Sequence, residues 1–314
     1  MSQRPLVSVV MPAYNAEGFV ADAIESVLAQ DYRPLEVLVV DDGSTDATGD
    51  VVQAYGAPVR CLRRENGGPA AARNTALREA GGDFIAFLDA DDLWHPGKLE
   101  VQAALLQARP DVGLCSARMS SFRSPEQVEW ASLPAEPPVC PIPLRMLVMR
   151  NPISTSTVMA RAEAVRQAGE FDEGIFGPED WDMWRRIAQH WKVLSMGTVA
   201  AAYRQRAASV SGDARRMLAN NRKVIRKSLR DNPRVPWHVR RRAWSYLHFD
   251  AAREYGLESR LRALWHTARS LAGWPAPLGR EFCPALGRLR YAAAMLVRGW
   301  GRKDTRTLTE GSAP

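Results

Sequence analysis

The residues with the clearest capacity for chemistry are three carboxylates, Asp89, Asp91 and Asp92, which directly follow the apolar run 84–88. Five consecutive apolar residues require burial, whereas neighbouring carboxylates repel one another unless a cation or a cationic ligand lies between them. A buried strand that ends at a metal or ligand site satisfies both demands. Ligands of open α/β sheets bind at the carboxyl ends of the strands, so this stretch predicts such a site.

Alternating strands and helices are expected to position these carboxylates. In residues 1–116, short apolar runs alternate with segments of helical periodicity, and Asn15 is placed to cap the first helix. This order predicts parallel βαβ units with right-handed crossovers, and therefore a Rossmann-like, mostly parallel sheet flanked by helices. The predicted strands are 6–11, 35–40, 59–62, 84–88 and 112–115, and the predicted helices are 19–28, 47–55, 70–80 and 96–108.

The following region, residues 117–200, changes character. Five prolines between 133 and 144 predict a stiff surface connection. Residues 151–159 indicate a strand whose Ser and Thr hydroxyls face either a polar cavity or each other. Glu179, Asp180 and Asp182 open an amphipathic helix, where acids either complement the helix dipole or perform chemistry.

The composition of the chain indicates its domain organisation and its cellular location. The 314 residues, 46% of them hydrophobic, predict one large domain or one domain with an appendage. No apolar run of 18 residues and no basic-then-apolar leader occur, so the sequence predicts a cytoplasmic protein, either free or peripheral at the inner membrane face. The four cysteines lack metal-ligand spacing, which favours reduced structural thiols: Cys61, Cys115, Cys140 and Cys283.

Five motifs occur in a fixed order along the first two thirds of the chain. They are Val7–Asn15 (VSVVMPAYN), Val39–Asp46 (VVDDGSTD), Gly67–Ala76 (GGPAAARNTA), Phe87–Pro96 (FLDADDLWHP) and Glu179-Asp180. A single Asp-x-Asp would be weak evidence, but the ordered set is specific. Over about residues 5–200 the chain resembles an inverting glycosyltransferase of family 2, a nucleotide-sugar-dependent group with the GT-A fold.

The resemblance implies roles for the residues of these motifs in binding a nucleotide-sugar donor. Tyr14 is implied to stack on the base, and Asp42 to accept a hydrogen bond from the imide N–H of uracil. Arg73 is implied to reach the nucleotide or a phosphate oxygen, and an ordinary surface arginine is the alternative. The implied donor-binding residues are Pro12, Tyr14, Glu17, Asp42, Gly68, Arg73, Asp89 and Ala90. Asp91 is implied to bind Mg²⁺ or Mn²⁺, whose other ligands come from the diphosphate and water.

The same resemblance implies the catalytic groups. Asp180 matches the acid that takes the proton of the acceptor hydroxyl, Glu179 either binds the acceptor or supports the helix start, and Asp182 is a weaker candidate. Processive members of the family continue to a Gln-x-x-Arg-Trp motif, whereas Arg185-Arg186 follow here. Transfer of one sugar to a defined acceptor is therefore expected.

The C-terminal third differs from the rest in charge. Residues 1–200 carry 18 Lys and Arg against 27 Asp and Glu, whereas residues 201–314 carry 24 against 8. Arginines interspersed with five tryptophans suit an anionic membrane surface, or alternatively a helical appendage packed on the acidic part, and no motif favours nucleic acid. The predicted organisation is a catalytic domain over 1–210, basic helices over 211–302 and a disordered tail over 303–314.

Together these features predict a metal-dependent, inverting, non-processive transfer of a sugar, with uridine as the expected nucleotide. The acceptor would be a hydroxyl of a cell-surface glycan or of a lipid-linked precursor. One alternative is a noncatalytic nucleotide-sugar-binding or scaffold protein. Another is a sugar nucleotidyltransferase, which usually has a glycine-rich, Lys/Arg-containing loop after its first strand; here residues 12–15 are Pro-Ala-Tyr-Asn.

Overall fold

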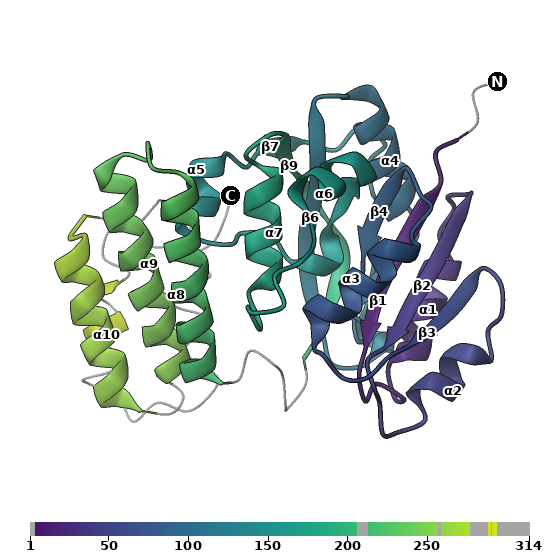
Figure 1. The fold of residues 1–314 in the computed structure, drawn as a ribbon, viewed down its shortest axis with the longest axis horizontal. Coiled ribbons are helices and arrows are strands. Elements are labelled where there is room, and N and C mark those ends of the chain that lie inside the picture. The colour runs from purple at the N-terminus through teal and green to yellow at the C-terminus, as the bar shows by residue number, and fades with distance from the viewer. Residues whose placement is uncertain (1–3, 206–212, 257–258, 277–287, 290, 294–314) are drawn as a thin grey trace. The chain divides into compact units, whose positions relative to one another are not determined.

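The computed structural model describes residues 4–205, 213–256, 259–276, 288–289 and 291–293 (Figure 1). The chain forms two compact units. The N-terminal unit comprises Met1–Leu147 and Asn151–Ala208, and the C-terminal unit comprises Val148–Arg150 and Ser209–Pro314. The tail predicted over 303–314 lies outside the described residues.

A nine-stranded sheet forms the centre of the N-terminal unit, with the order β3-β2-β1-β4-β8-β6-β9-β5 and β7 paired with β9. Its strands are β1 (Val7–Ala13), β2 (Leu35–Asp41), β3 (Val59–Arg63), β4 (Phe84–Phe87), β5 (Leu93–Trp94), β6 (Val112–Phe122), β7 (Val139–Pro141), β8 (Met159–Arg161) and β9 (Lys192–Arg204).

The first four predicted strands form the expected parallel block. β1 pairs in parallel with β2 and with β4, and β2 pairs in parallel with β3. The carboxyl ends of these strands therefore meet at one edge of the sheet. The other half of the sheet is mixed, because β8 is antiparallel to β4 and β6, whereas β6 and β9 are parallel. The predicted α/β class is confirmed, with the parallel order confined to β1–β4 and to the β6–β9 pair.

Helices cover both faces of this sheet. The N-terminal unit contains α1 (Val20–Leu28), α2 (Thr48–Gln53), α3 (Pro69–Glu79), α4 (Lys98–Ala108), α6 (Ala162–Ala168) and α7 (Glu179–Ile187), and α5 (Leu144–Met149) runs across the boundary of the two units. Helices α1, α2 and α4 bury their apolar side chains in one core, and α3, α6 and α7 in a second core. The buried positions of α1 recur at helical spacing, as predicted: Val20, Ala23, Ile24 and Val27.

Two local predictions were wrong. Asn15 does not cap α1, which begins at Val20; it has a φ of 46° and accepts a hydrogen bond from the Thr45 amide at 2.9 Å. Residues 151–159 do not form one strand. Thr155–Thr157 form a 3-10 helix, and the strand β8 begins only at Met159. Hydroxyls that bond to nearby groups compete with strand pairing, as Thr157 does by donating to the Ser154 carbonyl at 2.7 Å.

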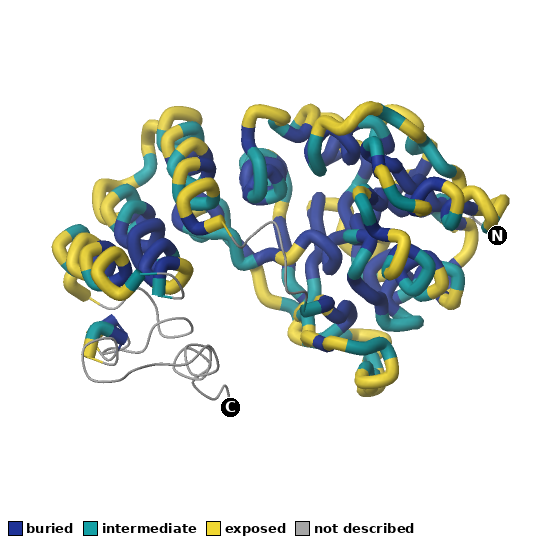
Figure 2. Tube along the Cα trace, turned by 90° about the horizontal axis from the view of Figure 1, so that it is seen from below, coloured by how far each residue is buried: buried dark blue, intermediate teal, exposed yellow. Residues whose placement is uncertain are grey.

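Among its described residues, the C-terminal unit contains the long helices α8 (Ala214–Asp231), α9 (Trp237–Tyr255) and α10 (Arg260–Gly273). Asp213 caps α8 by accepting a hydrogen bond from the Arg216 amide at 3.0 Å. Figure 2 shows α8 and α10 with exposed residues along one side and buried residues along the other, whereas residues 242–252 of α9 include no exposed residue. In the described parts of the chain, no helix combines the length and the apolar character needed to span a membrane. Cys61, Cys115 and Cys140 are free thiols, as predicted, and Cys283 lies outside the described residues.

Candidate active site

The predicted carboxylates lie in the turn between β4 and β5, and this turn is held from two sides. From one side, Ser156 Oγ donates to Asp92 Oδ2 at 2.6 Å. From the other, Arg204 donates through its backbone amide to Asp92 Oδ1 at 3.1 Å and through Nε to the Asp91 carbonyl at 2.9 Å. Burial, together with the nearby Asp89 and Asp91 charges, raises the pKa of Asp92. Asp92 is thus a structural member of the turn, whereas Asp89 keeps 38% of its side chain exposed.

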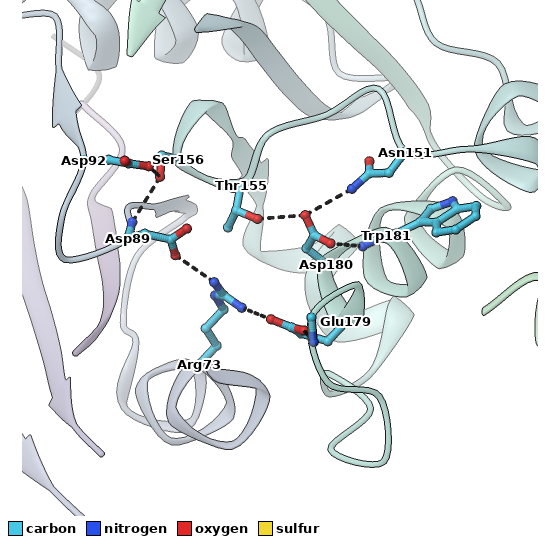
Figure 3. A network of polar contacts seen from close by, with 10 residues as sticks. Arg73, Asp89, Asp92, Asn151, Thr155, Ser156, Glu179, Asp180 and Trp181 are labelled. Atoms are coloured by element: carbon cyan, nitrogen blue, oxygen red, sulfur yellow. Dashed lines mark hydrogen bonds and ion pairs between the residues drawn. The ribbon is translucent and has the colours of Figure 1, made fainter. Parts of the chain in front are cut away.

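Arg73, on α3, joins the two ends of the site (Figure 3). Its Nη2 lies 2.7 Å from Asp89 Oδ1, and its Nη1 lies 2.6 Å from Glu179 Oε1. Burial alone would lower the pKa of Arg73, but the two carboxylates outweigh burial and raise it. The side chain is 5% exposed, so Arg73 is not a surface arginine. It neutralises carboxylates that lie far apart in the sequence.

Asp180, the predicted base, accepts three hydrogen bonds. Its Oδ2 accepts from Asn151 Nδ2 at 3.1 Å and from Thr155 Oγ1 at 2.9 Å, and its Oδ1 accepts from the Trp181 amide at 2.5 Å. Burial, and then the adjacent Glu179 charge, raises the pKa of Asp180 to about 7, although Arg73 and Thr155 act in the opposite direction. A carboxyl that titrates near neutral pH suits a general base.

The other acids at the start of α7 have structural partners. Glu179 is buried; its Oε1 pairs with Arg73, and its Oε2 accepts from the Gly177 amide at 2.7 Å. This arrangement favours support of the helix start over contact with an acceptor. Asp182 is fully buried and ion-paired with Arg185 and Arg186, each at 2.9 Å, so an acceptor has no access to it.

Asp42, predicted to meet the base, holds the turn that precedes α3. It accepts from the Gly68 amide at 2.7 Å and from the Gly67 amide, and it lies 3.2 Å from Arg64 Nε. Gly68 has a φ of 86°, and a Cβ there would lie 3.1 Å from the Phe176 ring. A glycine is therefore required at this position. A contact of Asp42 with uracil stays a prediction.

The remaining predicted donor-binding residues lie at or near the same edge of the sheet. Pro12 is half-buried near the end of β1, Tyr14 is 50% exposed in the following loop, and Ala90 is buried in the turn after β4. Glu17 is exposed and accepts from the Ala47 amide at 2.9 Å, which ties the first loop to the start of α2. Their contacts with a nucleotide stay predictions.

The side chains of the site can bind a divalent cation only if the substrate supplies further ligands to it. Among the described residues, no group of three or more His, Cys, Asp or Glu side chains could hold a metal ion. Asp91 would supply one hard oxygen ligand, on a turn whose backbone accepts a hydrogen bond from Arg204. Mg²⁺ and Mn²⁺ accept few protein ligands when phosphate oxygens and water supply the others. Asp91 therefore fits such a metal together with a diphosphate.

Four residues of the site were not predicted from the sequence. Asn151 and Thr155 contact the candidate base, and Ser156 and Arg204 hold the carboxylate turn. The hydroxyl-rich run 154–157 could have indicated Thr155 and Ser156, because a polar cavity facing these hydroxyls was one of the two alternatives considered for it. Nothing in the sequence pointed to Arg204.

Comparison with known proteins places these observations in a family. The family model described as "Glycosyl transferase family 2" matches residues 8–164, which is half of the chain. Among curated relatives, the chain is 48% identical over 103 residues to the Escherichia coli protein WfgD, whose name is UDP-Glc:alpha-D-GlcNAc-diphosphoundecaprenol beta-1,3-glucosyltransferase. That alignment covers 32% of this chain and 41% of WfgD. The chain spans less than two thirds of the length of the curated relatives that it matches.

Solved structures show the same fold. A mannosyltransferase from Pyrobaculum calidifontis, determined with GDP-Man and Mn²⁺, has a TM-score of 0.60 and 23% identity, and the match covers 98% of this chain and 84% of that one. S. aureus TarS, determined with UDP-GlcNAc, has a TM-score of 0.57 and 20% identity, with 85% and 89% covered. Both matches confirm the predicted GT-A type fold.

Proposed function

The chain belongs to glycosyl transferase family 2, and from this premise we propose that it transfers one sugar from a nucleotide sugar to a hydroxyl of an acceptor, with inversion. The observation that carries the proposal is the pair of ion pairs made by Arg73. They bring the carboxylate turn after β4 and the Asp180 end of α7 into one site. Arg73 therefore links the proposed donor side to Glu179, the residue next to the proposed base.

In the proposed reaction, the acceptor oxygen forms a bond to the anomeric carbon while the bond from that carbon to the diphosphate oxygen breaks. The electron pair of the broken bond leaves with the nucleoside diphosphate, and the acceptor proton passes to the Asp180 carboxylate. Attack opposite the leaving group inverts the anomeric centre. Arg73 would place positive charge beside the donor, and Thr155 and Asn151 would hold Asp180 in position. A divalent cation on Asp91 would offset the negative charge of the leaving diphosphate.

The proposed donor is a uridine nucleotide sugar and the proposed acceptor a lipid-linked glycan precursor. A carboxylate at Asp42 accepts hydrogen bonds, which favours a base that presents an N–H. The name of WfgD, a relative at 48% identity, specifies UDP-Glc and a diphosphoundecaprenol acceptor. This likeness supports the donor and acceptor classes and leaves the individual sugar open.

The test is a panel assay on the full chain. Purified protein with Mn²⁺ is given UDP-, GDP- and dTDP-sugars together with a GlcNAc-diphosphoundecaprenol acceptor, and released nucleoside diphosphate is measured. Acceptor-dependent release with a UDP-sugar, and a product of inverted configuration by NMR, would support the proposal. Binding without turnover would indicate a noncatalytic protein, and pyrophosphate release from UTP and a sugar phosphate would indicate a nucleotidyltransferase.

Replacing Asp91 with alanine is expected to remove the metal dependence of donor binding. The variant loses the proposed protein ligand, whereas the turn keeps its backbone bond from Arg204. We expect the affinity for UDP with Mn²⁺, measured by calorimetry, to fall at least tenfold, and the affinity without metal to change little. Asp83→Ala, an exposed aspartate at the opposite end of β4, is the matched control. Undiminished binding of UDP with Mn²⁺ in Asp91→Ala would remove Asp91 as a metal ligand.

We also propose that the C-terminal unit binds an anionic membrane surface. Trp237 and Trp265 are 65% and 52% exposed, and Arg241 and Arg269 lie over their rings at 5.9 and 5.3 Å. Tryptophan beside arginine suits the bilayer interface, where each cation contributes about 1 kcal/mol.

Reversing the charge of Arg215 and Arg226, which are exposed on α8, is expected to weaken binding to anionic vesicles at least tenfold. Sedimentation with vesicles of phosphatidylglycerol and phosphatidylcholine measures the effect. Reversing Arg166 and Lys192, two exposed cations of the N-terminal unit, is the control. Equal losses in both double variants would show nonspecific attraction and would contradict a dedicated surface.

A further inference from the structure

Two neighbouring hydroxyl residues, Thr155 and Ser156, serve opposite sides of the candidate active site. They lie in the 3-10 helix Thr155–Thr157, immediately before β8, and both are buried. Figure 3 shows Thr155 directed toward Asp180 and Ser156 directed toward Asp89 and Asp92. One short helical turn therefore contacts both the candidate base and the carboxylate turn after β4.

On the acceptor side, Thr155 and Asn151 are, among the described residues, the side chains that donate hydrogen bonds to Asp180. Thr155 Oγ1 donates to Asp180 Oδ2 at 2.9 Å, and Asn151 Nδ2 donates to the same oxygen at 3.1 Å. The other groups that face this carboxyl are Glu179 and the Trp181 amide from α7 and the Arg73 charge from α3. A hydrogen bond to the ionised form favours that form, so Thr155 lowers the pKa of Asp180 against the effects of burial and Glu179.

On the donor side, Ser156 joins two points of the carboxylate turn. Its Oγ donates to Asp92 Oδ2 at 2.6 Å and accepts from the Asp89 amide at 3.1 Å. The Ser156 carbonyl in turn accepts from Trp94 Nε1 at 2.6 Å, and Trp94 is buried in the core. Ser156 is therefore anchored to the core and fixes the backbone on which Asp89 and Asp91 lie.

We propose that Thr155 and Ser156 are positioning residues for sugar transfer: Thr155 orients the base, Ser156 orients the turn that binds the donor, and their adjacency fixes the separation between the two. The inference rests on the proposed function. Neither residue touches the reacting atoms in this assignment. Substitution of Thr155 should therefore change the pH dependence of transfer, because Thr155 contacts Asp180. Substitution of Ser156 should change the affinity for UDP, because Ser156 contacts the carboxylate turn.

The experiment compares single-atom changes at the two positions. Thr155→Val removes the hydroxyl at constant shape, Thr155→Ser keeps it, and Ser156→Ala removes the other hydroxyl. Thr157→Val is the matched control, because Thr157 is buried in the same turn and donates only to the Ser154 carbonyl at 2.7 Å. The readouts are the pH dependence of kcat/KM for the acceptor and the Kd for UDP with Mn²⁺.

Thr155→Val is expected to move the acidic limb of the pH profile upward by about one pH unit, because one hydrogen bond to the carboxylate is lost. Its Kd for UDP should stay within twofold, and Thr155→Ser should restore the profile. Ser156→Ala is expected to weaken UDP binding at least threefold and to leave the acidic limb of the pH profile at the same pH. Thr157→Val should change neither readout.

The inference is overturned if Thr157→Val produces the same changes, or if Thr155→Val leaves the limb of an active enzyme in place. Should Ser156→Ala fail to fold, Ser156→Cys, which keeps the size of the side chain but donates weakly, reports the same loss of UDP affinity. Failure of the proposed function shows differently, as an absence of turnover in the wild-type chain. The Kd of Ser156→Ala then still decides the donor-side assignment.

Discussion

Asp180→Asn is expected to lose about 10²- to 10⁴-fold in transfer rate, which is the usual contribution of a general base. Asparagine keeps the size of the side chain and an acceptor oxygen for Thr155, but it cannot take the proton of the acceptor hydroxyl. Binding of UDP should persist, because Asp180 does not contact the carboxylate turn. Single-turnover transfer and UDP calorimetry on the same preparation measure the two properties.

The same substitution is expected to stabilise the folded protein at pH 8. The pKa of Asp180 rises from an ordinary 3.8 to about 7 on folding, so the folded state holds the proton more tightly. The contribution of Asp180 to the free energy of unfolding therefore falls as the pH rises from about 4 to 7. Above pH 7 the folded protein bears the full cost of the buried charge. Removing the charge should raise the Tm at pH 8 by a few degrees and change it little at pH 4.

Asp182→Asn provides the opposite control on the same helix. Asp182 is fully buried and paired with Arg185 and Arg186, so its loss should lower the Tm at pH 8.

Near-normal transfer in Asp180→Asn would exclude Asp180 as the base. A lowered Tm in Asp180→Asn would instead mean that its hydrogen bonds outweigh the burial of its charge.

Arg73→Met is expected to give the largest loss of stability in the N-terminal unit. The arginine and Glu179 are 5% and 4% exposed, and methionine leaves the Glu179 carboxylate buried without its cation. Breaking a buried ion pair in this way costs about 3–5 kcal/mol. Urea unfolding measures the change, and transfer should be lost as well, because Asp89 and Glu179 would repel each other.

Two further variants test whether the loss of stability in Arg73→Met comes from the buried, unpaired charge of Glu179. Arg78→Met lies on the same helix and breaks an ion pair with Glu170 in which both side chains are more than half exposed, so it should cost less than about 1 kcal/mol. Adding Glu179→Gln to Arg73→Met removes the orphaned charge and should recover part of the stability. If Arg73→Met costs no more than Arg78→Met, the buried bridge contributes little to stability.

The sequence predicted those parts of the site that depend on local order. Asp89 and Asp91 follow a buried apolar strand, and Asp180 opens an amphipathic helix, so their positions follow from strand ends and helix starts. The parallel block β1–β4 was likewise predictable from alternation of strand and helix.

The parts that were missed depend on how distant strands pair. β8 runs antiparallel to β4, so the residues just before β8 meet the carboxyl end of β4. This pairing brings Thr155 and Ser156 into the site, and no local pattern specifies it. Arg73 itself was named from its motif, but its burial was not predicted, because it follows from two carboxylates on separate elements and not from its own helix.

Arg204 sets the shortest length at which the candidate active site can be complete. It is the last residue of β9, and its guanidinium lies over the rings of Phe19 and Phe122 at 5.1 and 4.6 Å while it donates to Asp22 and to the Asp91 carbonyl. A chain ended at residue 164, where the family match stops, would lack Asp180, the proposed base. A chain ended at residue 200 would contain every predicted motif, yet its carboxylate turn would be held from one side only. A fragment whose carboxylate turn is held from both sides must therefore include Arg204, which lies 40 residues beyond the end of the family-model match.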